Sequence, residues 1–239
     1  MIGIIGAMDK EVNDLKSVMG GPGDSLTPKI EKHAGMDFCE GTLGGQDVVL
    51  VRSGIGKVNA AVAAEILVAV FNVKAIINTG IAGSLDANID IGDIVLSTDS
   101  LEHDMNVKGL GYERGVVPDQ EASIYPADAE LRAVAKEACE KVCPDINVFE
   151  GRVVSGDIFV SEKAMKEKMV KDFGGTCTEM EGASIAHVAW LNQIPYLIIR
   201  SISDKADDSA EMDYPSFQKM AIENSVKLVT AMMNSMKKI

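Results

Sequence analysis

The sequence is poor in basic residues: 23 Lys and Arg stand against 36 Asp and Glu, which gives its 239 residues a formal net charge of −13. A chain of this sign repels phosphate, so non-specific binding to nucleic acid is disfavoured. Proline is also scarce, at seven residues, while 46% of the residues are hydrophobic. This composition excludes a collagen-like chain and does not fit intrinsic disorder. We expect one globular domain over residues 1–239.

Long hydrophobic runs are missing as well. The longest apolar stretch, residues 60–71, is interrupted by Glu65 and is too short to cross a bilayer. The first residues lack the basic leader of a signal peptide and soon become acidic. We therefore expect a cytoplasmic protein that does not enter a membrane.

Cysteine and histidine are few, with four and three residues. Four Cys in a chain of this length do not make a disulfide scaffold, which favours free thiols in a reducing compartment. Cys139 and Cys143 lie four residues apart, but a zinc site needs further ligands that the neighbouring sequence lacks. We expect His33 at the surface, His187 in the core and His103 at the start of an irregular segment. No metal site is predicted.

Strand-like and helix-like segments alternate along the chain, which predicts an α/β fold of three layers, αβα, with a central mixed β-sheet. The run at 196–202 is almost wholly apolar, as expected for a strand covered by helices on both faces. A Gly-Gly pair at 44–45 predicts a hairpin between two of the strands. The expected strands are 2–6, 36–43, 46–53, 75–78, 94–100, 148–155 and 196–202. The expected helices are 10–19, 57–71, 128–141, 162–171, 181–192 and 217–236.

Residues 102–127 fit neither pattern. They contain three Gly and two Pro interleaved with apolar residues. Loops of this length in compact domains are usually functional or mobile, and exposed apolar residues favour a lid or a subunit contact. The alternative is a surface loop without function.

Two glycine-rich segments follow strands. Residues 54–59 read Gly-Ile-Gly-Lys-Val-Asn, which lacks the third glycine of a dinucleotide-binding motif. Residues 78–83 read Asn-Thr-Gly-Ile-Ala-Gly and are predicted to form a turn at the end of a buried strand. Ligands bind at the carboxyl ends of strands in open α/β sheets, so both turns are expected to line one pocket.

Acidic residues also gather at strand ends. Glu11 begins the first predicted helix, five residues after Gly6, and Glu181 lies between a short apolar approach and another predicted helix. Asp204 follows the predicted strand 196–202, and Arg200 precedes Asp204 by four residues. Singly, each carboxylate could stabilise a helix N-terminus or cap a turn. Together they favour a carboxylate-lined pocket. The sequence has neither a Gly-x-Ser-x-Gly elbow nor a P-loop, which counts against acyl transfer and NTP hydrolysis.

Six short motifs occur in order over nearly the whole chain. They are residues 3–12 (GIIGAMDKEV), 53–58 (SGIGKV), 77–83 (INTGIAG), 154–160 (VSGDIFV), 179–181 (EME) and 200–204 (RSISD). Together they resemble the 5′-methylthioadenosine/S-adenosylhomocysteine nucleosidases of the nucleoside phosphorylase superfamily. The resemblance implies a nucleoside phosphorylase-like fold, N-glycosidic hydrolysis without a cofactor, a role in methionine salvage, and a homodimer.

The resemblance also implies roles for individual residues. Glu11 activates water, Asp204 protonates adenine at N7, and Arg200 orients Glu11 or the water. Glu181 grips the ribose hydroxyls, where a carboxylate suits two O–H donors and faces the positive charge that develops on the sugar. The implied substrate-binding set comprises Met8, Ile55, Ile81, Ala82, Gly83, Phe159, Val160, Glu179, Met180, Glu181, Ser203 and Tyr214, with Val107, Leu110 and Pro118 supplied to the 5′-alkylthio slot by the partner subunit.

The chain departs from the family pattern at Ile81, where many relatives have Ser, so a hydroxyl contact is lost there. Leu110 and Tyr214 stand where relatives often have Phe. Three alternatives to this hydrolysis stay open. A phosphorylase of the same fold would need a phosphate cradle, but Asp9-Lys10-Glu11 places acids there. A nucleosidase for 6-amino-6-deoxyfutalosine would use the same acids. A non-catalytic nucleoside-binding module would need no acid on both sides of the bond.

Overall fold

The computed structural model describes residues 1–23 and 27–236. Its strands are β1 (Ile2–Gly6), β2 (Lys29–His33), β3 (Met36–Leu43), β4 (Gln46–Arg52), β5 (Ala75–Ser84), β6 (Ile94–Glu102), β7 (Tyr125–Pro126), β8 (Val148–Ser155), β9 (Cys177–Glu179) and β10 (Tyr196–Asp204). Its helices are α1 (Asp9–Ser17), α2 (Lys57–Ala69), α3 (Ala129–Val142), α4 (Lys163–Phe173), α5 (Gly182–Leu191) and α6 (Ala210–Ser235), with a short 3₁₀ helix η1 (Lys108–Leu110).

The strands form one mixed sheet in the order β10-β6-β8-β9-β5-β1-β4-β3-β2. β5 pairs in parallel with β1 on one side and with β10 on the other. Because β10 also pairs with β6, and β9 with β5, the five strands β10, β6, β8, β9 and β5 close into a ring. The predicted mixed sheet is confirmed, and its ring closure is a finding that the alternation of elements did not predict.

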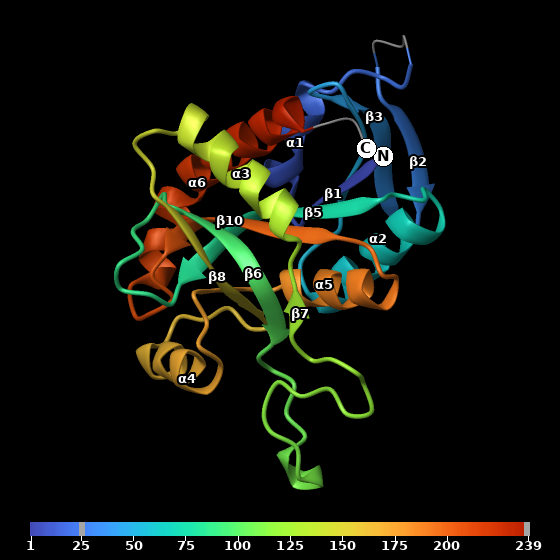
Figure 1. Cartoon of the computed structure of the whole chain (residues 1–239). Helices are drawn as coiled ribbons and strands as arrows, with labels where there is room; N and C mark the ends of the chain where they lie inside the picture. Colours follow the sequence, from blue (N-terminus) through green and yellow to red (C-terminus); the bar gives the residue numbers. More distant parts are fainter. Residues whose placement is uncertain (24–26, 237–239) are drawn as a thin grey trace.

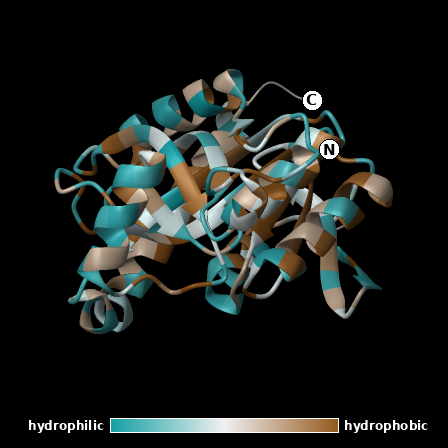
Figure 2. Ribbon diagram, turned by 90° about the horizontal axis from the view of Figure 1, so that it is seen from below, coloured by the Kyte–Doolittle hydropathy of each residue, from teal (hydrophilic) through white to brown (hydrophobic). Residues whose placement is uncertain are grey.

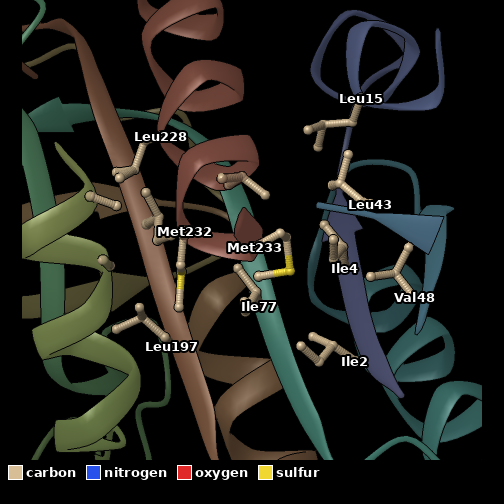
Figure 3. Packing of buried hydrophobic residues seen from close by; sticks show 14 of the residues in the cluster. Ile2, Ile4, Leu15, Leu43, Val48, Ile77, Leu197, Leu228, Met232 and Met233 are labelled. Atoms are coloured by element: carbon tan, nitrogen blue, oxygen red, sulfur yellow. The ribbon is translucent and has the colours of Figure 1, made fainter. Parts of the chain in front are cut away.

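Helices cover both faces of the sheet, which confirms the three-layer architecture (Figure 1). On one face α1, α3 and α6 pack on a core that includes Ile4 of β1, and on the other α2 and α5 pack on a core that includes Ile5. Figure 3 shows the first core, where Met232 and Met233 of α6 lie over Ile77 of β5. The central strands are mostly hydrophobic, while the outer helices alternate between hydrophobic and hydrophilic residues (Figure 2).

Local signals explain several element boundaries. Gly44 and Gly45 have φ of 57° and 79°, the left-handed conformation of a two-residue hairpin turn, and they join β3 to β4 as predicted. Asp128 caps α3, because its side chain accepts a hydrogen bond from the amide of Leu131 at 2.8 Å.

The predicted boundaries that were wrong include the ends of β5 and β10 and the start of α6. β5 continues to Ser84, beyond the predicted end at 78, because β10 and β9 keep pairing with it through the glycines. β10 likewise includes Asp204, which is therefore neither a turn residue nor an N-cap. α6 begins at Ala210 rather than at 217, with Pro215 inside it.

The irregular segment between β6 and β7 extends away from the body and carries η1 at its tip (Figure 1). Its root is firmly attached. Arg114 donates to the carbonyl of His103 at 3.0 Å and to Asp172 at 2.9 Å, and its guanidinium lies 5.2 Å from the ring centre of Phe173. Its tip is exposed to solvent, and the side chain of Leu110 there is 74% exposed.

Candidate active site

One cavity of about 430 Å³ gathers most of the residues that the sequence singled out. It lies where β1, β5, β9 and β10 end, and residues 158–160 and Tyr214 contribute to its wall. The predicted residues that line it are Met8, Glu11, Ile55, Ile81, Ala82, Gly83, Phe159, Val160, Glu179, Met180, Glu181, Ser203, Asp204 and Tyr214.

Four predicted residues do not line this cavity. Arg200 lies buried behind its wall, and Val107, Leu110 and Pro118 belong to the extended segment. Three lining residues were missed, namely Ala7, Ile158 and Thr178. Each of the three is next in sequence to a predicted residue, so their position in the motifs was the available signal.

Glu11 is held by backbone amides. One carboxylate oxygen, Oε2, accepts from the amides of Ala7 at 2.7 Å and Met8 at 2.9 Å, and Oε1 accepts from the amide of Ile81 at 3.3 Å. Burial raises the pKa of Glu11 above its ordinary value, although the charge of Arg200 and these three amides offset part of the rise. A fixed carboxylate with a raised pKa is a competent general base.

The glycines of β5 make room for the carboxylates. A Cβ atom at Gly80 would lie 2.6 Å from Oε1 of Glu11, and one at Gly83 would lie 2.7 Å from Oδ1 of Asp204. The segment 78–83 is therefore not the predicted turn. It is an extended strand whose two glycines let acids from distant segments approach the backbone closely.

Asp204 lies at the last position of β10 and is buried. Its Oδ1 accepts from the amide of Ala206 at 2.9 Å, and its Oδ2 accepts from the hydroxyl of Ser203 at 2.8 Å. Burial raises the pKa of Asp204 more than these hydrogen bonds lower it. The carboxyl group thus keeps a proton to higher pH than an exposed Asp does.

Glu179 and Arg200 form a fully buried ion pair at 2.5 Å. Burial alone would raise the pKa of Glu179, but Arg200, Ser155 and the amide of Gly182 lower it below its ordinary value. The guanidinium of Arg200 also donates to the side-chain oxygen of Asn78. Arg200 was expected to orient Glu11 or its water. The structure directs its hydrogen bonds to Glu179 and Asn78 instead, so Arg200 acts on Glu11 through its charge.

Glu181 immediately precedes α5 and accepts from the amide of Gly56 at 2.8 Å. Burial, followed by the nearby charge of Glu179, raises the pKa of Glu181 to about 8. The two acids of the Glu-Met-Glu segment therefore differ in setting. Glu179 is a paired structural anion, and Glu181 faces the cavity with one oxygen already bonded.

The described residues hold no cluster of three or more His, Cys, Asp or Glu side chains that could bind a metal ion. All four Cys are buried free thiols. Among the residues that the structure describes, no helix is long and apolar enough to span a membrane. His33 is half-buried, whereas His103 is buried and His187 stacks on the ring of Tyr125 at 4.7 Å.

The family model described as the phosphorylase superfamily matches residues 1–234. The chain belongs to this superfamily. A 5′-methylthioadenosine/S-adenosylhomocysteine nucleosidase of Halalkalibacterium halodurans is 41% identical over 231 residues, which are 96% of each chain. One of an Exiguobacterium species is 40% identical over 232 residues, again 96% of each chain. These relatives confirm the resemblance expected from the motifs, and with it a nucleosidase, an N-glycosyl hydrolase.

Solved structures agree with this placement in the phosphorylase superfamily. A nucleosidase of the same name from Neisseria meningitidis, in complex with methylthio-immucillin-A, matches with a TM-score of 0.91 and 35% identity, covering 98% of this chain and 99% of that one. A futalosine hydrolase of Helicobacter pylori matches with a TM-score of 0.89 and 30% identity, covering 98% and 97%. The nucleoside phosphorylase-like fold is confirmed.

Ile81 stands where the motif resemblance implies Ser in many relatives. Its side chain packs against Ala221 and Ile222 of α6, beside Met8 and Tyr214. Its amide still donates to Glu11. The substitution therefore keeps the backbone contact, removes the hydroxyl, and makes this side of the cavity more apolar.

Proposed function

We propose that the protein hydrolyses the N-glycosidic bond of 5′-methylthioadenosine and S-adenosylhomocysteine, releasing adenine and the 5′-thio-substituted ribose. The observation that carries the proposal is the pair of buried carboxylates, Glu11 and Asp204, which line one cavity and both have raised pKa values. Glycosidases use two such groups, one to activate water and one to protonate the leaving group.

In the proposed mechanism Glu11 takes a proton from water as the water attacks the anomeric carbon. Asp204 donates its proton to N7 of adenine, so the base departs neutral. Glu181 binds the ribose hydroxyls. Ser203 holds Asp204 in place through its 2.8 Å hydrogen bond. No cofactor takes part.

The remaining lining residues fit the two ends of such a substrate. The backbone of Val160 and the ring of Phe159 would bind adenine. An apolar slot of Met8, Ile55, Phe159 and Tyr214 would take the 5′-alkylthio group, and the rings of Phe159 and Tyr214 meet edge to face at 5.7 Å. Ala82, Gly83, Glu179 and Met180 complete the binding surface.

Water, rather than phosphate, is the proposed attacking group. The amides of Ala7, Met8 and Ile81 could cradle an anion, but the carboxylate of Glu11 already occupies them. A second anion there would meet like charge. This supports hydrolysis over phosphorolysis.

Hydrolysis of 6-amino-6-deoxyfutalosine is a second candidate activity. It is favoured by the Helicobacter pylori futalosine hydrolase, which matches over 98% of this chain. Both reactions would use Glu11 and Asp204, so the difference lies in the 5′ slot.

We also propose a homodimer in which the partner's extended segment completes the 5′ slot. Support comes from exposed apolar side chains on α2, α5 and that segment, namely Val58, Val62, Leu110, Tyr112, Ile124, Trp190 and Leu191. Val107, Leu110 and Pro118 are not among the residues that line the cavity of their own chain. Leu110→Asp should raise KM for alkylthio substrates more than for 5′-hydroxyl ones, because it buries an unpaired charge. An active monomer in sedimentation would contradict the shared slot.

A single domain over residues 1–239 and a cytoplasmic location complete the proposal. The first and last strands, β1 and β10, both pair with β5, which supports one folding unit. Buried free thiols suit a reducing compartment.

Product analysis with methylthioadenosine, with and without phosphate, tests the function. Adenine with free methylthioribose in both conditions is the expected result. Adenine with a sugar 1-phosphate would indicate a phosphorylase, and binding without products would indicate a nucleoside-binding module. The same assay on 6-amino-6-deoxyfutalosine ranks the second candidate by kcat/KM.

A further inference from the structure

The purine side of the cavity is built from a segment without regular structure. Residues 156–160 connect β8 to the start of α4 and contribute Ile158, Phe159 and Val160 to the lining. A wall of this kind needs fixation from outside the segment if it is to present a constant surface to a ligand.

That fixation comes from a closed set of hydrogen bonds among three residues, Lys57, Asp104 and Asp157, which uses both their side chains and two backbone amides. Asp104 accepts from the amide of Asp157 at 3.0 Å through Oδ2. Asp157 accepts from the amide of Lys57 at 2.8 Å. The ammonium group of Lys57 returns to Oδ1 of Asp104 at 2.7 Å, and also contacts Glu102 at 3.2 Å. We name this set the purine-wall anchor.

The anchor also reaches the ribose side of the cavity. The amide of Gly56 donates to Glu181, and the next amide, that of Lys57, donates to Asp157. Gly56 has a φ of 96°, which glycine adopts without strain. One turn therefore holds both the carboxylate of Glu181 and the wall segment, so a shift of the turn would move both.

The wall segment is supported from below by His103. A Cβ atom at Gly156 would lie 2.5 Å from the ring of His103, which is buried. The ring and the anchor together leave the segment little freedom to withdraw from the cavity.

We propose that Lys57, Asp104 and Asp157 are positioning residues that set the affinity of the cavity for the purine. The proposal rests on the adenine nucleoside function proposed above. None of the three lines the cavity, so they act through residues 158–160 and Glu181. Lys57 and Asp104 are ion-paired with side chains about one-fifth exposed, a setting in which charge-assisted hydrogen bonds exceed neutral ones in strength.

Asp157 offers the sharpest test, because it is exposed and can be replaced without a cavity. Asp157→Ala removes the acceptor for the amide of Lys57, whereas Asp157→Asn keeps one. Calorimetry with free adenine should show Kd raised about tenfold in Asp157→Ala, the usual worth of one charge-assisted hydrogen bond. Asp157→Asn should stay within about threefold of the wild type, on the same scale.

Lys57→Met and Lys57→Arg form a second matched pair, and Lys136→Met is a control that removes a surface lysine paired with Glu150. We expect Lys57→Met to raise KM for methylthioadenosine more than it lowers kcat, with Lys57→Arg recovering part of the loss. Lys136→Met should leave both constants unchanged.

The outcomes distinguish failure of the proposed function from failure of the purine-wall anchor. A wild-type protein that fails to bind adenine and to cleave methylthioadenosine would refute the proposed function. A wild-type protein that binds adenine, with Asp157→Ala and Lys57→Met within twofold of it, would refute the anchor alone. Lower melting temperatures with unchanged adenine Kd would also refute it, because they would leave the anchor a purely structural role.

Discussion

Replacing Glu11 by Gln tests the base assignment with little change in shape. An amide oxygen in the place of Oε2 still accepts from Ala7 and Met8. The amide nitrogen then faces the N–H of Ile81, where Oε1 now accepts at 3.3 Å. One lost acceptor costs about 1–3 kcal/mol of folding free energy. This loss is opposed by a gain, because a neutral group replaces a carboxylate whose raised pKa shows that burial penalises its charge. We expect the melting temperature to change little.

Turnover should respond far more strongly than stability. Gln cannot take a proton from water, so kcat should fall on the order of 10²–10⁴-fold, or about 3–5 kcal/mol of transition-state stabilisation. Single-turnover release of adenine from methylthioadenosine measures the chemical step, and a thermal melt beside it checks the fold. A folded Glu11→Gln protein that keeps most of its activity would show that another group activates the water.

Further predictions concern the other acid, its strand and pH. Asp204→Asn should bind adenine but lose turnover, and the loss should be smaller for a substrate whose base leaves without protonation. Equal losses on both substrates would make Asp204 a positioning residue. Gly80→Ala should displace Glu11, since the new Cβ would lie 2.6 Å from its carboxylate; circular dichroism should show a folded protein with kcat reduced about 100-fold or more. The pKa of Glu181 is raised to about 8 in the folded protein, from about 4.5 in the unfolded chain. Its protonated form should therefore contribute stability that is fully present below pH 4.5 and is lost as the pH rises through 8. Between pH 5 and 9, the melting temperature should therefore fall less steeply with pH for Glu181→Gln than for the wild type. An equal fall in the two proteins would contradict the assignment.

The acids could be predicted from the sequence because they lie beside short, strongly apolar strands. Asp204 ends the apolar strand β10, and Glu11 lies in the helix that follows the apolar strand β1. Glu181 begins a helix after a short apolar approach, and adjacent strands bring their ends to one edge. The fold class followed from the same alternation of elements. Local patterns could not show which residues contact one another after distant strands have paired.

The segment 78–83 is the clearest example. Glycines after an apolar run are typical of a turn, yet the pairing of β5 with β10 keeps this segment extended. The need for glycine comes from Glu11 and Asp204, which lie far away in sequence and contact it only in the fold. The same limit applies to Arg200, since nothing local indicates which of several acids a buried guanidinium will pair with.

The place of β5 in the sheet also has a consequence for how the chain acquires its structure. β5 pairs with β1, which precedes it by about 70 residues, and with β10, which follows it by about 120. During synthesis, β5 and β1 can therefore associate early. Most of the other edge of β5 stays open until residues 196–204 have emerged, because β9 pairs only with its last two residues. An unpaired apolar edge recruits strands from other chains, and such distant parallel pairings form slowly. Fragments that end before β10 should aggregate rather than fold. On refolding of the full chain, the rate at which activity returns should follow the pairing of β10 with β5 rather than the initial hydrophobic collapse.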